Sequence, residues 1–128
     1  MSIRSYKDLL VWQKAIELTT LCYKVTSGFP KDETYGLTSQ IRRASVSIAA
    51  NIAEGYGRDQ TGSFLQFLRI AQGSNRELET HAIIARNVGV MDGDIESDIS
   101  SRCDEISRMM RSLIRSIEAG RGDNHGSR

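Results

Sequence analysis

The stretch that decides the fold is QIRRASVSIAANIAEG (residues 40–55), a helix-like segment that is apolar around most of its circumference. At about 100° per residue, most of its polar residues fall in one sector of roughly 80°, and Arg42 is the main exception. They are Gln40, Arg43, Ser47, Asn51 and Glu54. A surface helix of a bundle normally keeps about half of its circumference polar. We therefore expect this helix to make a second apolar contact besides its contact with the core.

Four segments with helical periodicity are separated by glycine-bearing breaks, and alternating β-branched residues are scarce. We expect helices at about 6–27, from a start between 31 and 37 to residue 55, at about 63–87 and at about 94–119. Ser5, with Asp8 three residues later, predicts a capping box on the first helix. Short loops make successive helices antiparallel, which predicts an all-α, up-down-up-down four-helix bundle over residues 1–119. The tail, residues 120–128, has no apolar residue and is expected to be disordered.

The predicted core follows apolar stripes along these helices. The first helix carries two stripes: Leu9, Trp12, Ile16, Thr19 and Tyr23, and Val11, Ala15, Leu18, Cys22 and Val25. The third carries Phe64, Phe67, Leu68, Ala71, Asn75, Leu78, Ala82 and Ala85, and the fourth Ile95, Ile99, Cys103, Ile106, Met110, Leu113 and Ile117. The last spacing is near the period of a bundle seam. Both cysteines are expected to be small reduced core residues rather than a disulfide.

Length, net charge and the distribution of apolar residues limit which classes of protein this chain can belong to. A chain of 128 residues can bury one core without a disulfide or metal. The net charge of +1 neither indicates nor excludes a nucleic-acid partner, because a local basic patch can lie on a neutral chain. No apolar run approaches the ~20 residues that cross a bilayer, and the N-terminus lacks the apolar core of a signal peptide. We expect a cytoplasmic protein without a membrane partner.

The sequence carries no recognisable catalytic or metal-binding constellation. Glu77 and His81 share a helix face, but a di-iron bundle needs Glu-x-x-His on two helices, and the other histidine, His125, lies in the tail. The glycine-rich loop at residues 55–62 lacks the Gly-Lys-Ser/Thr of a phosphate-binding loop. We expect no enzymatic activity, no catalytic residue, no metal and no cofactor.

The second apolar face of the segment at residues 40–55 predicts a homo-oligomer, because no helix of a four-helix bundle is surrounded by its own chain. Small residues on this helix, Ala44, Ala49, Ala50 and Ala53, permit close approach of another helix. Two interpretations of the polar stripe stay open. Either Arg43 pairs with Glu54 or Glu77 in a buried network that fixes register, or the stripe lines a groove where Arg43 meets an anion.

Several motifs resemble one known family. They are QIRRASVSIAANIAEGYGR (residues 40–58), FLRIAQGSNRELET (67–80), LVWQKA (10–15), the Phe29-Pro30 turn and Glu33-x-Tyr35-Gly36-Leu37. Over residues 6–115 the chain resembles the 23S rRNA intervening-sequence proteins, or S23 ribosomal proteins. This family is similar to the accessory variability determinant of bacterial diversity-generating retroelements. The resemblance implies an antiparallel four-helix bundle that assembles as a pentamer and associates with nucleic acid and a reverse transcriptase.

The expected site residues form three groups. A polar network is expected from Gln40, Arg43, Asn51, Glu54, Glu77 and Glu79. Close helix crossings are expected at Gly55, Gly73 and Ser74. A mid-helix glycine costs about 1 kcal/mol against alanine, and a close crossing would explain that cost. The candidate nucleic-acid contacts are Lys14, Arg42, Arg43, Arg58 and Arg76, and copies around a ring would sum their fields. We expect a non-enzymatic oligomeric bundle that binds RNA or DNA; the alternative is a protein-interaction scaffold with a structural polar stripe.

Overall fold

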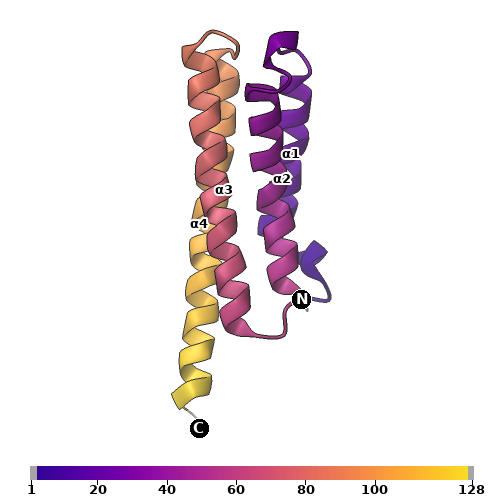
Figure 1. Ribbon diagram of the computed structural model, residues 1–128. Helices are drawn as coiled ribbons and strands as arrows, with labels where there is room; N and C mark the ends of the chain where they lie inside the picture. The colour runs from indigo at the N-terminus through magenta and orange to yellow at the C-terminus, as the bar shows by residue number, and fades with distance from the viewer. Residues whose placement is uncertain (1–2, 127–128) are drawn as a thin grey trace.

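The computed structural model describes the backbone of residues 3–126 and the side chains of residues 3–120. Two short 3-10 helices, η1 (Tyr6–Asp8) and η2 (Lys31–Glu33), accompany four α-helices. These are α1 (Leu10–Thr26), α2 (Leu37–Tyr56), α3 (Thr61–Asn87) and α4 (Gly93–Gly126). Successive helices run in opposite directions (Figure 1), so the predicted all-α, up-down-up-down bundle is confirmed.

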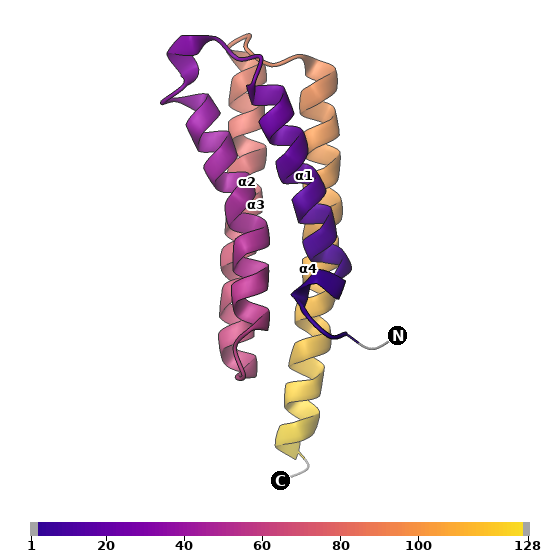
Figure 2. The same ribbon diagram turned by 90° about the vertical axis from the view of Figure 1, so that its right-hand side faces the viewer.

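The helices pack in a ring. Helix α2 packs against α1 and α3, and α4 packs against α3 and α1, whereas the two diagonal pairs make no close backbone contact within the described chain. The view turned by 90° shows α4 continuing past the loop that joins α2 to α3 (Figure 2). Each helix therefore keeps one side free of its own chain.

No helix in the described part of the chain is both long and apolar enough to pass through a bilayer.

The first predicted helix is divided in two. Ser5 Oγ accepts a hydrogen bond from the Lys7 N–H (3.1 Å), and the Asp8 carboxylate accepts one from the Ser5 N–H (3.3 Å), which confirms the capping box. The box caps only the turn η1, because Leu9 adopts an extended conformation (φ −73°, ψ 122°) before α1 begins. The single helix expected from residue 6 is therefore wrong. The break brings the Tyr6 ring edge-on to Trp12, with centroids 5.3 Å apart.

The buried core follows the predicted stripes with local shifts. On α1 the core stripe is Val11, Ala15, Leu18, Cys22 and Thr26, while Ile16 and Tyr23 of the other stripe are exposed. On α3, Leu65 is buried in place of the two phenylalanines; the rest of the stripe is as predicted. On α4, Ile99, Cys103, Ile106 and Met110 are buried, Ile114 joins them, and Ile95, Leu113 and Ile117 are partly buried.

Polar atoms inside the core link neighbouring helices. Asn75 is 3% exposed, and its side-chain N–H donates to the Cys103 carbonyl (2.8 Å), tying α3 to α4. Both cysteines are free and buried, as predicted. Burial raises the pKa of the Cys22 thiol to about 12 and also raises the pKa of Cys103, so both stay protonated at neutral pH. They act as small apolar residues.

Helix α4 continues to Gly126, beyond the end expected near Ala119. The tail predicted to be disordered, residues 120–128, lies almost wholly outside the residues whose side chains are described, and its disorder stays a prediction.

Gly55 marks the tight crossing of α2 and α3. A Cβ atom at this position would lie 2.7 Å from Phe67 Cβ and 3.0 Å from Phe64 Cδ1. The first of these atoms is fixed to the backbone of α3 and cannot rotate away. The prediction of a close helix crossing at Gly55 is thus confirmed, and it fixes how the two helices meet near the loop that joins them.

We expect Gly55→Ala to lower the free energy of unfolding by about 1–3 kcal/mol, because the added methyl group overpacks the crossing. Gly57→Ala is the matched control: its Cβ would make only ordinary contacts, the nearest at 3.6 Å, and the backbone is already helical (φ −73°, ψ −9°). Urea unfolding of both variants measures the difference. Equal stabilities would contradict the crossing geometry.

Candidate interaction surface on helices α2 and α3

Helix α2 is apolar on two sides. Toward the core it buries Ile41, Ile48 and Ile52 completely. On the opposite side Val46 is 43% exposed and Ala50 is exposed. The prediction that this helix carries a second apolar face is therefore confirmed on the single chain, and that face lacks a cover from the described residues.

The exposed side of α2 forms one wall of an apolar groove with α1. The groove has a volume of about 300 Å³. It is lined by Tyr6, Trp12, Ile16, Thr19, Val46, Ala49, Ala50 and Ala53. Aromatic rings lie on the α1 side and small residues on the α2 side. The only hydroxyl on α1 that lines it, Thr19 Oγ1, is already engaged with the carbonyls of Ala15 (2.9 Å) and Ser45 (3.0 Å).

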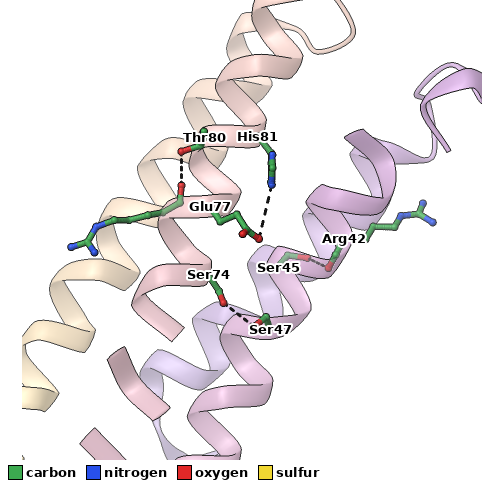
Figure 3. Close-up of polar contacts among 8 residues, drawn as sticks. Arg42, Ser45, Ser47, Ser74, Glu77, Thr80 and His81 are labelled. Atoms are coloured by element: carbon green, nitrogen blue, oxygen red, sulfur yellow. Dashed lines mark hydrogen bonds and ion pairs between the residues drawn. The ribbon is translucent and has the colours of Figure 1, made fainter. Parts of the chain in front are cut away.

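The polar stripe of α2 faces α3 and makes a small network. Ser47 Oγ and Ser74 Oγ share a hydrogen bond of 2.8 Å across the two helices (Figure 3). Asn51 Nδ2 donates to both the Ser47 carbonyl (2.8 Å) and Ser47 Oγ (2.9 Å). Ser74, expected at a helix crossing, does lie at the contact between α2 and α3. The structural interpretation of the stripe holds for these three residues.

The rest of the predicted network does not form within the chain. Glu54 pairs with Arg58 (3.2 Å), and Glu77 lies 4.0 Å from His81 Nε2, so neither carboxylate pairs with Arg43. Among the described side chains, Arg43, Gln40 and Glu79 enter no ion pair or side-chain hydrogen bond. Within the single chain Arg43 therefore pairs with neither Glu54 nor Glu77, and Gln40, Arg43 and Glu54 are exposed.

Arg42 is a structural tether rather than a free cation. Its Nε donates to Thr26 Oγ1 (2.8 Å), and its Nη2 donates to the Tyr23 carbonyl (3.4 Å) and Ser27 Oγ (3.5 Å) at the end of α1. Its guanidinium lies 4.5 Å from the centre of the Tyr23 ring. A cation at helix C-terminal carbonyls is favoured by the helix dipole. Figure 3 shows Arg42 directed away from the Ser47–Ser74 contact.

The other candidate basic residues come from different elements of the chain. Arg58, beyond the end of α2, pairs with Glu54 and lies 5.1 Å from the centre of the Phe67 ring. Lys14 is half-buried on α1, and Arg76 is exposed on α3. The five candidates therefore come from α1, α2, α3 and the loop after α2, and two of them, Arg42 and Arg58, already hold partners within the chain.

Among described residues there is no group of three potential metal ligands.

Gly73 behaves differently from Gly55. It lies in the middle of α3, is exposed, and a Cβ placed there would meet no atom within 4 Å apart from its neighbours and the nearby backbone of α3 itself. The expectation of a close crossing at Gly73 is therefore wrong within the single chain. No contact made by this chain offsets the low helix propensity of glycine at that position.

We expect Arg42→Ala to lower the free energy of unfolding by about 1–2 kcal/mol, because it removes a charged donor from hydroxyl and carbonyl acceptors that tie α1 to α2. The neighbouring Arg43→Ala is the matched control and should change it by less than about 0.5 kcal/mol, as for other unpaired surface residues. Thermal and urea unfolding report both. A larger effect at Arg43 would contradict this assignment.

The fold and the sequence of this chain match one known family. The model of a family described as 23S rRNA-intervening sequence protein matches residues 7–112. The chain is also similar to the crystal structure of a protein of unknown function from the S23 ribosomal protein family of Bacteroides thetaiotaomicron, with a TM-score of 0.76 and 22% identity over 82% of this chain and 98% of that chain. Among curated proteins, none matches. The bundle, its motifs and the family match agree: the chain belongs to the family of 23S rRNA-intervening sequence proteins.

Proposed function

We propose that this chain is a non-enzymatic homo-oligomeric bundle, a pentamer by family resemblance, that binds nucleic acid as an accessory to a reverse transcriptase or an RNA-associated complex. The observation that carries the proposal is the second apolar face of α2, with Val46 43% and the neighbouring Ile16 of α1 40% exposed. Contiguous exposed apolar surface of this kind marks interaction sites. Assembly is the first part of the proposal, and nucleic-acid binding is the second.

The second part rests on arginines that remain free on the surface. Arg43 and Arg76 are exposed and enter no ion pair among the described side chains. Arg111 and Arg115 on α4 are also exposed and enter no ion pair among the described side chains. The sequence alone indicates only that their place late in the helix suits the helix dipole. By contrast, Arg58, Arg69, Arg86, Arg102 and Arg108 pair with carboxylates. Repeating a few free cations around a ring concentrates positive potential that one nearly neutral chain lacks.

The alternative is a protein scaffold that binds no nucleic acid. The Ser47–Ser74 and Asn51 hydrogen bonds favour it, because they give the polar stripe of α2 a structural role. The two functions differ in one measurable property: backbone phosphate binding by arginines weakens steeply with salt, since it releases condensed counterions.

We expect the purified oligomer to bind labelled structured RNA or duplex DNA in fluorescence anisotropy at about 50 mM salt and to lose at least tenfold in affinity at about 200 mM, the behaviour of multiple phosphate contacts. Arg76→Glu and Arg111→Glu should each weaken binding and reduce the slope of log affinity against log salt by about one for each phosphate that the arginine no longer neutralises. Lys31→Glu, on the exposed turn η2, is the control with the same charge change.

Light scattering on each variant tests whether assembly is intact. In a variant that assembles normally, a loss of affinity reports on contact with nucleic acid. Flat titrations at both salt concentrations, with an intact oligomer, would contradict nucleic-acid binding and favour the scaffold.

A further inference from the structure

We propose that the bundle opens along the line of contact between α1 and α4, while the contact between α2 and α3 stays closed and acts as the hinge. We call the line of contact between two neighbouring helices a seam. The inference depends neither on the homo-oligomer nor on the nucleic-acid binding proposed above.

The two seams that involve α2 are held by polar contacts. At the α1–α2 seam, Arg42 Nε donates to Thr26 Oγ1 (2.8 Å). At the α2–α3 seam, Ser47 Oγ and Ser74 Oγ share a hydrogen bond of 2.8 Å (Figure 3). Separating either pair of helices would break these contacts, and a donor or acceptor left unpaired costs free energy unless water replaces its partner.

The α3–α4 seam carries polar contacts at more than one level. Inside the core, Asn75 Nδ2 donates to the Cys103 carbonyl (2.8 Å). Near the connecting loop, Arg86 Nη1 donates to Glu96 Oε1 (3.0 Å), and Glu96 is only 8% exposed. These two helices therefore form a hairpin that resists separation.

The α1–α4 seam lacks such contacts. Within the described part of the chain, no hydrogen bond or ion pair joins α1 to α4. Glu17 of α1 and Arg102 of α4 line the same groove, but Arg102 Nε donates to Asp98 Oδ1 of its own helix (3.0 Å). These two helices also make the least extensive backbone contact of the four neighbouring pairs. Apolar packing therefore holds this seam.

Two grooves run along the α1–α4 seam. The first, about 400 Å³ in volume, lies between Leu9 and Leu10 on one side and Met109, Ser112 and Leu113 on the other. The second, about 380 Å³, lies between Ile16, Leu21 and Lys24 of α1 and Arg102 of α4. Side chains beside a groove lack neighbours on one side, so fewer dispersion contacts are lost when these two helices separate.

The connections of the chain leave this seam free to open. No loop joins α1 to α4, because they are the first and the last α-helix. The α1–α2 hairpin and the α3–α4 hairpin lie on opposite sides of the bundle (Figure 1), and α2 crosses α3 tightly at Gly55. Rotation of the two hairpins about this crossing would open the α1–α4 seam without stretching a loop. Openings smaller than global unfolding often follow such supersecondary units.

The two cysteines lie on the two helices that would separate. Cys22 of α1 is 0% and Cys103 of α4 is 1% exposed, and both belong to the core. In the closed bundle, burial shields both thiols and raises the pKa of each, so they stay protonated. A maleimide reacts with an accessible thiolate. Opening of the seam should therefore make both thiols reactive in the same event.

The test compares three thiols in one molecule, the full chain carrying Ala44→Cys. Ala44 is 2% exposed and lies three residues before Ser47, on the side of α2 that meets α3, so the introduced thiol reports on the hinge. We expect N-ethylmaleimide in native buffer to label Cys22 and Cys103 at similar initial rates, at least tenfold faster than the introduced thiol. Peptide mass spectrometry measures each rate, which is divided by the rate of the same thiol in urea-unfolded protein.

Two results of this experiment would overturn the proposal. Labelling of the introduced thiol as fast as that of the native pair would mean that α2 and α3 separate too, as in global unfolding. Rapid labelling of only one native thiol would mean that one helix is disturbed alone, because separation of α1 from α4 exposes both thiols.

Ser112→Leu tests the seam from the opposite direction. Ser112 is exposed and lines the first groove with Leu10, so a leucine side chain there adds apolar contact between α4 and α1. We expect labelling of both native thiols to slow at least threefold. Ser107→Leu is the matched control, because Ser107 lies about three turns before Glu118, the partner of Arg69, and so faces α3 rather than α1. Unchanged labelling in Ser112→Leu, or equal slowing in both variants, would place the opening elsewhere and overturn the proposal.

Discussion

The structure depends on one constraint: α2 has two apolar sides and only one core of its own chain to bury them in. Its inner side is buried in the bundle through Ile41, Ile48 and Ile52, and its outer side leaves Val46 and Ala50 in contact with solvent. Burial of apolar area contributes about 25 cal/mol per Å², so the uncovered face forgoes a stabilisation that the proposed contact with a second copy would supply. The groove between α1 and α2 lies along that uncovered side.

Much of this arrangement follows from periodicity and helix geometry. The four helices, the core stripe through Leu18, Leu68, Leu78 and Met110, and the two-sided character of α2 are properties of spacing, which the sequence displays directly. The capping box at Ser5 is local and was predictable for the same reason. The break at Leu9 was not predictable, because helical spacing continues through it; the structure places the Tyr6 ring against Trp12 there.

The candidate site was less predictable, because the state of a charged residue depends on partners from other helices. Helical spacing separates Arg42 from Arg43, but it does not show that the first is held by the end of α1 and that the second has no partner among the described side chains. Gly55 and Gly73 are likewise the same residue type, and only the positions of Phe64 and Phe67 distinguish a required glycine from one with open space around it. At Gly73 the cost of about 1 kcal/mol relative to alanine has no compensation inside the chain.

The central claim is that the outer face of α2 is covered by another copy of the chain. Light scattering coupled to size-exclusion chromatography at micromolar concentration tests it most directly. The account predicts one species with a mass several times the 14.3 kDa of a single chain, reduced toward that mass when Val46 is replaced by glutamate. A wild-type protein of 14.3 kDa across the accessible concentrations would contradict it.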